Sequence, residues 1–192
     1  SFKSVRWKYI ENVPVVSLVW MADECEIEEE FFVPSEGGLL FRRVNIRNPT
    51  DRALDTKIHL ALAPSFVLFD EILADEKERT VRAHGFADMK LQCLEKSVQT
   101  SGRYDMSVVL GQIKPGEARR ARFIYSIGGA EKILNKWRES GLWRKTTRYW
   151  SSRNQISTGN DVLDQLYSVS KIGLRAMTGR SGKRDSGIWM YN

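Results

Sequence analysis

Three residues near the end of the chain have side chains that could bind a sugar. The segment "SGIWMYN" places Trp189, Tyr191 and Asn192 close together. An aromatic ring can stack on the C–H face of a pyranose, while an amide can donate to and accept from sugar hydroxyl groups. The alternative is that the two aromatic residues complete a hydrophobic core. Residue types alone leave both interpretations open.

The other groups capable of chemistry have simpler explanations. His59 and His84 are isolated, with no Cys or His at the spacing of a metal site. No phosphate-binding glycine motif occurs. The acidic run 23–30 lacks the turn residues of a calcium loop, so we expect it to form a solvated face or to pair with arginines of a neighbouring strand. Those arginines are Arg42, Arg43 and Arg47. We therefore expect no cofactor and no bound metal ion.

A second segment, "LWRKTTRYWSSR", mixes basic and aromatic residues. Its members are Trp143, Arg144, Lys145, Arg148, Tyr149, Trp150 and Arg153. This composition is typical of a platform for single-stranded nucleic acid. It is also expected of an irregular connector whose aromatic rings anchor it to the sandwich while its arginines extend into solvent. The connector is the better explanation because the basic residues are spread through a segment that must also connect two layers. We adopt the connector, and nucleic acid is not the partner that we expect.

The composition is that of a globular protein with no membrane-spanning segment. The chain has 192 residues, of which 42% are hydrophobic and 28% charged, and its net charge is +6. The excess of positive charge lies in the last third, since residues 1–129 contain 18 Lys/Arg and 19 Asp/Glu, whereas residues 130–192 contain 12 and 5. Cys25 and Cys93 occupy inward strand positions, which favours buried free thiols. The alternative, a single disulfide between them, is left open by the sequence. The compartment is undetermined, with a slight preference for the cytoplasm.

Residues 1–129 alternate between apolar and polar side chains with a period of two. This period predicts half-buried antiparallel strands, and the intervening Gly, Pro and Asn residues predict turns. No helical pattern interrupts the series, so we expect an antiparallel β-sandwich. The inward positions of four of these strands are Leu40, Val44 and Ile46; Ile58, Leu60 and Leu62; Met89, Leu91 and Cys93; and Ala121, Phe123, Tyr125 and Ile127.

After Gly129 the period changes to that of a helix. Residues 130–157 are expected to form a linker helix ending near Gly141, followed by the connector. Residues 158–192 contain the strongest helical pattern, with an apolar stripe that includes Val162, Leu163 and Leu166. A capping box between Thr158 and Asp161 is predicted to start that helix. The helix has no helical partner in the sequence, so it either packs on the sandwich or begins a further helical domain.

This order of parts resembles the glucoamylase-like glycosidases and their glycogen-debranching relatives. The resemblance lies in a sandwich that closes with "IKPGEARRARFIYSIGG", a linker helix, the segment "LWRKTTRYWSSR", an amphipathic helix and "SGIWMYN". It implies a mainly β fold: an antiparallel β supersandwich, a linker helix and the first helix of a truncated six-hairpin α/α barrel. It also implies that the sandwich packs on the rest of its own catalytic barrel.

The resemblance further implies a glycoside hydrolase that acts on α-glucosidic oligosaccharides or polysaccharides. Trp189, Tyr191 and Asn192 would then line the approach to the sugar site, whereas the two catalytic carboxylates would lie beyond Asn192. The family's Trp-x-Arg-Asp box is absent. Because no pair of carboxylates within the chain can be assigned to the two catalytic roles, these 192 residues alone are expected to be inactive. The alternatives are a non-catalytic module whose basic, aromatic tail binds an anionic partner, and a carbohydrate-binding sandwich without a barrel.

Overall fold

The computed structural model describes most of the chain in eleven segments. They are residues 2–10, 13–22, 24–35, 37–61, 69–85, 88–100, 105–136, 138–151, 157–176, 178–181 and 184–188. The predicted site residues Trp189, Tyr191 and Asn192 lie outside these segments, as does the inward position Leu62.

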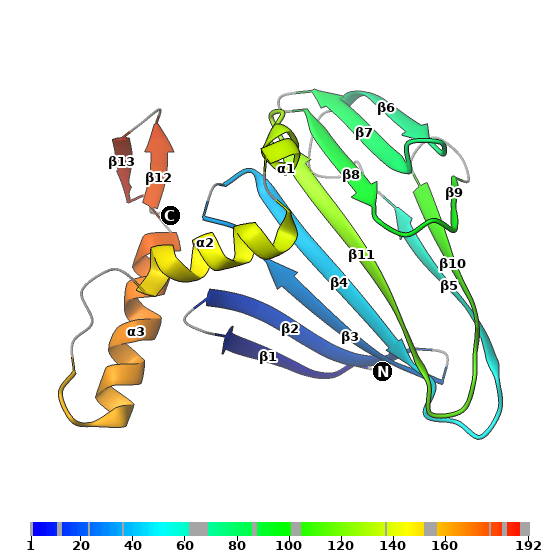
Figure 1. Ribbon diagram of the computed structural model, residues 1–192, viewed down its shortest axis with the longest axis horizontal. Helices are drawn as coiled ribbons and strands as arrows, with labels where there is room; N and C mark the ends of the chain where they lie inside the picture. The colour runs from blue at the N-terminus through cyan, green and yellow to red at the C-terminus, as the bar shows by residue number, and fades with distance from the viewer. Residues whose placement is uncertain are drawn as a thin grey trace.

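The described strands form a large antiparallel sheet that curves through the molecule (Figure 1). Its eight strands lie in the order β1-β2-β3-β4-β11-β8-β7-β6. Their bounds are β1 (Phe2–Ile10), β2 (Val13–Ala22), β3 (Cys25–Phe32), β4 (Leu39–Arg47), β11 (Ala118–Ile127), β8 (Met89–Cys93), β7 (Thr80–Gly85) and β6 (Phe69–Asp75). Strand β11 joins two groups of consecutive strands because it pairs with β4 on one side and β8 on the other.

A smaller sheet covers part of one face of the large sheet. It has the order β5-β10-β9, from β5 (Leu54–Ala61), β10 (Asp105–Ile113) and β9 (Val98–Thr100). We call the covered side of the large sheet its core face and the opposite side its helix face. Between the two sheets lies one core of buried residues, which includes Val44, Ile58, Met106 and Phe123. The prediction of a mainly β, antiparallel, sandwich-like fold is therefore confirmed.

Most of the predicted inward positions are buried in this core. Ile58, Leu60, Leu91, Cys93, Val44, Ile46, Ala121 and Phe123 are all buried. Met89 and Tyr125 are partly buried and pack against this core, and Leu40 is half-buried. Ile127 departs furthest from the prediction, since it lies 48% exposed at the end of β11. Cys25 and Cys93 are buried free thiols, as expected, and burial raises the pKa of Cys93.

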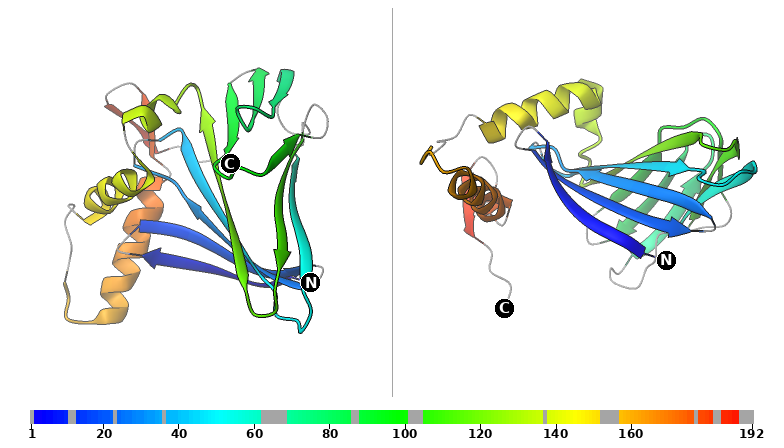
Figure 2. Two further views of the ribbon diagram at one scale, coloured as in Figure 1. Left: turned by 45° about the vertical axis from the view of Figure 1, so that its right-hand side comes forward. Right: turned by 90° about the horizontal axis from the view of Figure 1, so that it is seen from below.

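Two helices lie on the helix face and cover a second apolar cluster. They are α1 (Lys132–Lys136) and α2 (Glu139–Ser151), which Figure 2 shows passing across one end of the large sheet. Leu142 of α2 is buried against Phe41 and Ile124 of the sheet, with Trp143 and Trp150 packed around them. Hydrophobic burial on both faces of β4 and β11 thus fixes the sheet between two layers.

The segment predicted as an irregular connector is therefore largely helical. Strand positions 39 and 41 present Leu39 and Phe41 to the helix layer, and these side chains need an apolar cover. Leu142, Thr146 and Trp150 recur at the spacing of one helical face and supply that cover. The expected anchoring of the aromatics is confirmed for Trp143 and Trp150, although the predicted helix end at Gly141 is wrong because α2 continues through it.

Close approach at the start of the helix layer requires a glycine in the turn between β3 and β4. Gly38 has φ +68°, and a Cβ there would lie 2.7 Å from the Cβ of Ala130. Its carbonyl oxygen accepts a hydrogen bond from the amide of Ile127 (2.9 Å). Any larger residue would therefore strain both the turn and the contact with the segment that enters α1.

The third helix, α3 (Asp161–Ala176), confirms the predicted amphipathic helix but begins differently. The side chain of Asn160, and not of Thr158, caps it by accepting hydrogen bonds from the amides of Val162 (3.0 Å) and Leu163 (3.2 Å). The partner of Thr158 is Asp164 and not Asp161. Both the amide and the hydroxyl of Thr158 donate to Oδ1 of Asp164, at 2.8 and 2.7 Å.

After α3 the chain forms a short hairpin. Strand β12 (Thr178–Ser181) pairs antiparallel with β13 (Arg184–Ile188). Helix α3 and this hairpin lie apart from the two sheets, beyond the far end of α2 (Figures 1 and 2). None of the described helices has the length and apolar composition needed to cross a membrane.

The hydrogen bonds between Thr158 and Asp164 at the start of α3 give a pH-dependent prediction. Hydrogen bonds from the amide and hydroxyl of Thr158 lower the pKa of Asp164. Because the carboxylate is favoured in the folded state, its stabilisation of the α3 start is present above the unfolded pKa of about 3.9 and is lost as pH falls through the lower folded value. Carboxyl-detected NMR titration should place Asp164 below the ordinary range, and Thr158→Ala should return it toward that range. An unchanged Asp164 titration in the variant would contradict the assigned hydrogen bonds between Thr158 and Asp164.

Candidate functional site

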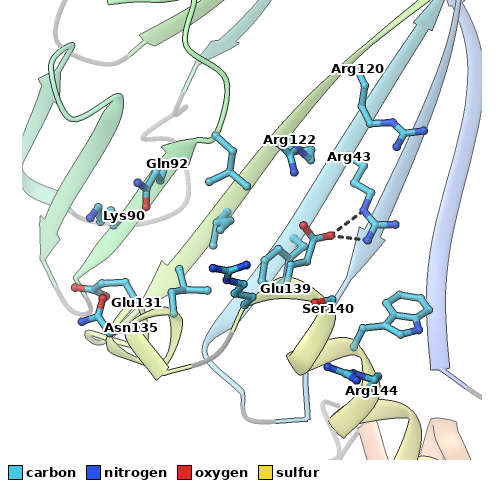
Figure 3. A pocket seen from close by; sticks show the side chains of 16 residues that line it. Arg43, Lys90, Gln92, Arg120, Arg122, Glu131, Asn135, Glu139, Ser140 and Arg144 are labelled. Atoms are coloured by element: carbon cyan, nitrogen blue, oxygen red, sulfur yellow. Dashed lines mark hydrogen bonds and ion pairs between the residues drawn. The ribbon is translucent and has the colours of Figure 1, made fainter.

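Two hollows of the described structure combine charged and aromatic side chains. One opens between the two sheets beside β5, and we call it the sandwich cleft. The other lies on the helix face beside α1 and α2, and we call it the helix-face groove (Figure 3). Strand β4 lines both hollows, because its alternate side chains point to opposite faces of the sheet.

The sandwich cleft is a hollow of about 310 Å³, and Trp20, Glu29 and Arg42 are among the residues that line it. These three residues belong to a row of polar and aromatic side chains on four adjacent strands. The row consists of Trp20, Glu29, Arg42 and Tyr125, and we call it the polar ladder. The indole N–H of Trp20 donates to Oε1 of Glu29 (3.2 Å), and Nε of Arg42 donates to Oε2 of Glu29 (2.7 Å). Arg42 also donates to the hydroxyl oxygen of Tyr125 (3.1 Å).

This arrangement satisfies a charge that would otherwise be costly to bury. Glu29 has only 6% of its side chain exposed, and both its oxygens accept a hydrogen bond. Burial alone would lower the pKa of Arg42, but its hydrogen bond to Glu29 and the nearby Tyr125 outweigh burial and raise it. The Arg42 guanidinium also lies 5.5 Å from the centre of the Phe31 ring. The predicted pairing of the acidic run with arginines is thus confirmed at Arg42.

The helix-face groove is larger and strongly basic. It is an open hollow of about 1230 Å³ with an apolar floor that includes Phe41, Leu94 and Ile124. Its basic lining residues are Arg43, Lys90, Arg120, Arg122, Arg138 and Arg144, and its acidic ones are Glu131 and Glu139. Figure 3 shows Arg43, Arg120 and Arg122 along β4 and β11, with Lys90 and Gln92 on β8.

Ion pairs fix one end of this groove to α2. Arg43 donates from Nε to Glu139 (3.0 Å; Figure 3). It also lies 3.7 Å from a carboxylate oxygen of Glu30. The predicted pairing is therefore confirmed at Arg43 as well, and the register places Arg47 opposite Glu26. The Arg43 guanidinium also lies 5.8 Å from the centre of the Trp143 ring, which packs on Phe32 (4.7 Å between ring centres).

A smaller hollow of about 250 Å³ continues the groove over β7 and shares Lys90 and Glu131 with it. It adds Arg82, together with His84, whose Nδ1 lies 3.0 Å from Oδ1 of Asp88. Among the residues that the structure describes, no group of three His, Cys, Asp or Glu side chains is placed to hold a metal ion. His59 contacts the Ser107 hydroxyl (3.1 Å) on the neighbouring strand and belongs to no such group.

The predicted sugar-binding residues are not among those that the structure describes. Trp189, Tyr191 and Asn192 lie outside the described residues, so their role stays a prediction. Neither hollow was identified from the sequence. The arginines were visible there as outward positions of separate strands, but only the order of strands in the sheet places them together.

Sequence comparison finds no match, whereas structural comparison finds related folds. No family model matches the chain, and no curated protein matches it. A candidate kojibiose phosphorylase from the human microbiome is similar with a TM-score of 0.54 and 10% identity. The similarity covers 78% of this chain and 24% of that enzyme. The chain therefore spans about a quarter of that protein's length, and the similarity shows a shared fold over the region that it covers.

Two further solved structures are similar at lower scores. The Slr1438 protein of Synechocystis sp. PCC 6803 has a TM-score of 0.44 and 10% identity over 65% of this chain and 65% of that protein. A candidate aldose 1-epimerase of Escherichia coli K12 has a TM-score of 0.42 and 7% identity, over 65% of this chain and 68% of that protein. These scores are too low to define a shared fold.

The polar ladder gives a prediction about stability. Glu29→Gln should destabilise the protein by about 3 kcal/mol, because it leaves Arg42 partly buried without its charged partner. Glu30→Gln is the matched control on the same strand. Its side chain is 26% exposed and lies at the longer distance of 3.7 Å from its arginine, so a cost below about 1 kcal/mol is expected. Urea unfolding measures both, and equal costs would contradict a structural role for the ladder.

Proposed function

We propose that this chain is the sandwich and linker region of a larger carbohydrate-active enzyme that acts on α-glucosidic oligosaccharides or polysaccharides. The region would position the catalytic domain and supply no catalytic carboxylate. Two observations support the proposal. The sandwich has the fold of a region that forms about a quarter of a kojibiose phosphorylase candidate, and α3 carries an unusual apolar surface.

The apolar surface of α3 is the observation that carries the helical part of the proposal. Val162, Leu163 and Leu166 are 74%, 51% and 60% exposed. They occupy one side of the first turns of a helix that lies apart from both sheets (Figure 2). A stripe of this kind needs another surface to cover it, because an amphipathic helix gains most of its stability from packing its apolar face. We assign that cover to further helices of an α/α barrel of which α3 is the first.

The substrate contacts in this proposal are Trp189, Tyr191 and Asn192. An aromatic pair and an amide next to a barrel helix would form one wall of a sugar site, with the catalytic groups supplied by later helices. The reaction is hydrolysis in the glucoamylase-like version. Transfer to inorganic phosphate is the second candidate, favoured by the fold similarity to a phosphorylase candidate.

Activity of the complete gene product tests the proposal. Glucose release from α-linked disaccharides and glucans should occur without phosphate if the enzyme is a hydrolase, and glucose 1-phosphate should form only with phosphate if it is a phosphorylase. Trp189→Ala should raise KM for the sugar, whereas Leu73→Ala, an exposed position on β6, should change neither KM nor kcat. A folded, complete protein that acts on none of these sugars under either condition would contradict the proposal.

A further inference from the structure

We propose that the helix face of the large sheet binds an anionic polysaccharide, one that carries carboxylate groups along its length. The inference goes beyond the proposed function and does not depend on it, because it concerns a surface of the sandwich itself. Its basis is a row of cations across four adjacent strands, consisting of Arg43 on β4, Arg120 and Arg122 on β11, Lys90 on β8 and Arg82 on β7. We call this row the cation band.

The register of the sheet sets like charges directly against each other within the cation band. Arg122 pairs with Arg43 across β11 and β4, and Arg82 pairs with Lys90 across β7 and β8. Like charges at directly opposed positions destabilise a sheet, whereas opposite charges stabilise it. Two such pairs on one face therefore form an arrangement that folding alone does not favour and that a bound anion would relieve.

Acidic neighbours neutralise only part of this charge. Arg43 pairs with Glu139 and Glu30, and Arg122 pairs with Glu95 (3.2 Å). Within the described part of the chain, Arg82, Lys90 and Arg120 have no carboxylate within ion-pair distance. Arg138 and Arg144 at the helical rim of the groove are also without one. The second like-charge pair, Arg82 with Lys90, thus has no acidic partner among the residues that the structure describes.

The dimensions of the band indicate an extended ligand. Four neighbouring strands span about 14 Å, since adjacent strands lie about 4.8 Å apart. Strand positions 120 and 122 add a second dimension along β11, because alternate residues of a strand lie on the same face. A single small anion would reach only a fraction of these cations, whereas a chain with repeated negative groups would reach most of them.

The other side chains of the groove match a sugar acid. Gln92, Asn135 and Ser140 provide neutral donors and acceptors between the cations, and Figure 3 shows them in the groove with Glu131 and Glu139. Hydroxyl groups of a sugar can donate to such carboxylates, while its own carboxylate accepts from arginine. A ligand with both carboxylate and hydroxyl groups therefore pairs with the acidic residues as well as the basic ones.

Nucleic acid and acidic protein fit the same lining less well. Bases need free aromatic faces, but the Trp143 ring in the groove packs on Phe32 and has the Arg43 guanidinium near its face. The carboxylates of Glu131 and Glu139 would repel closely spaced phosphates. An acidic peptide segment carries carboxylates but no comparable density of hydroxyl groups for these acceptors.

Binding of defined oligomers tests the inference. The probe is an oligogalacturonate of ten residues, compared with a neutral maltodextrin, a ten-residue oligothymidylate and a ten-residue oligoglutamate, with affinities measured by calorimetry from 50 to 300 mM salt. The triple variant Arg82→Gln/Lys90→Gln/Arg120→Gln removes three unpaired cations of the band. The control triple variant Lys57→Gln/Lys77→Gln/Lys114→Gln removes the same charge from exposed positions elsewhere.

Oligogalacturonate should bind, more tightly than the other three probes and more weakly as salt rises. The band variant should bind it at least about tenfold more weakly, with a salt slope smaller by about 2, since each neutralised charge contributes on the order of 0.7. The control variant should lose less than about twofold. Four results would each overturn the inference: no binding of oligogalacturonate, equal binding of maltodextrin, tighter binding of oligothymidylate or oligoglutamate, or an equal loss in the control variant. None of them bears on whether the complete protein cleaves an α-glucoside.

Discussion

The pairing of β4 with β11 is the interaction on which the rest of the structure depends. These strands lie at the centre of the large sheet, in register from Leu39 with Ser126 to Arg47 with Ala118. Because successive side chains alternate in direction, the pair contributes Val44 and Phe123 to the core between the sheets, and Phe41 and Ile124 to the cluster under α2. Shifting the register by one residue would exchange these two sets and disrupt both layers.

The same alternation places charge on both faces in two different chemical settings. On the core face, Arg42 is half buried, and its charge is compensated within the protein by Glu29, with a further hydrogen bond to the Tyr125 hydroxyl. Trp20 in turn donates to Glu29. On the helix face, the neighbouring Arg43 is tied to Glu139, whereas Arg82, Lys90 and Arg120 have no acidic partner within the described part of the chain. Buried charges must be compensated for the protein to fold, whereas cations at an open groove can remain for a ligand. The consecutive residues Arg42 and Arg43 therefore lie in different settings: Arg42 has a structural role in the core, and Arg43 lies at the groove for which we propose a binding role.

Much of the sandwich could be predicted from the sequence because burial on one side imposes a period of two. That period identified the inward positions of Val44, Ile58, Leu91 and Phe123, and local charge patterning identified the pairing of the acidic run with arginines. The helix α2 was missed because Thr146 and Thr147 and the nearby aromatics have modest helix propensity. Packing against the strands overrides that propensity, so the tertiary context decides its conformation.

The candidate sites were beyond the reach of sequence because they depend on strand order. Nothing local to Arg43, Lys90 or Arg122 indicates that β11 lies between β4 and β8. The cap of α3 was misassigned for a local reason. The sequence pattern pairs Thr158 with Asp161, but the side chain of Asn160 reaches the first helical amides and Thr158 bonds to Asp164 instead. The predicted contacts of Trp189 and Tyr191 with sugar depend on a domain that would follow α3.

Hydrogen exchange of backbone amides tests the central position of β4 and β11 most directly. If this pair holds both layers, its amides should exchange only through global unfolding and be the slowest in the protein, while those of β1, β6 and α3 exchange faster through local opening. The contradicting result would be exchange in β4 and β11 as fast as in the two edge strands. In that case the sheet would not be organised around this pair, and the two-faced arrangement of its arginines would lose its structural basis.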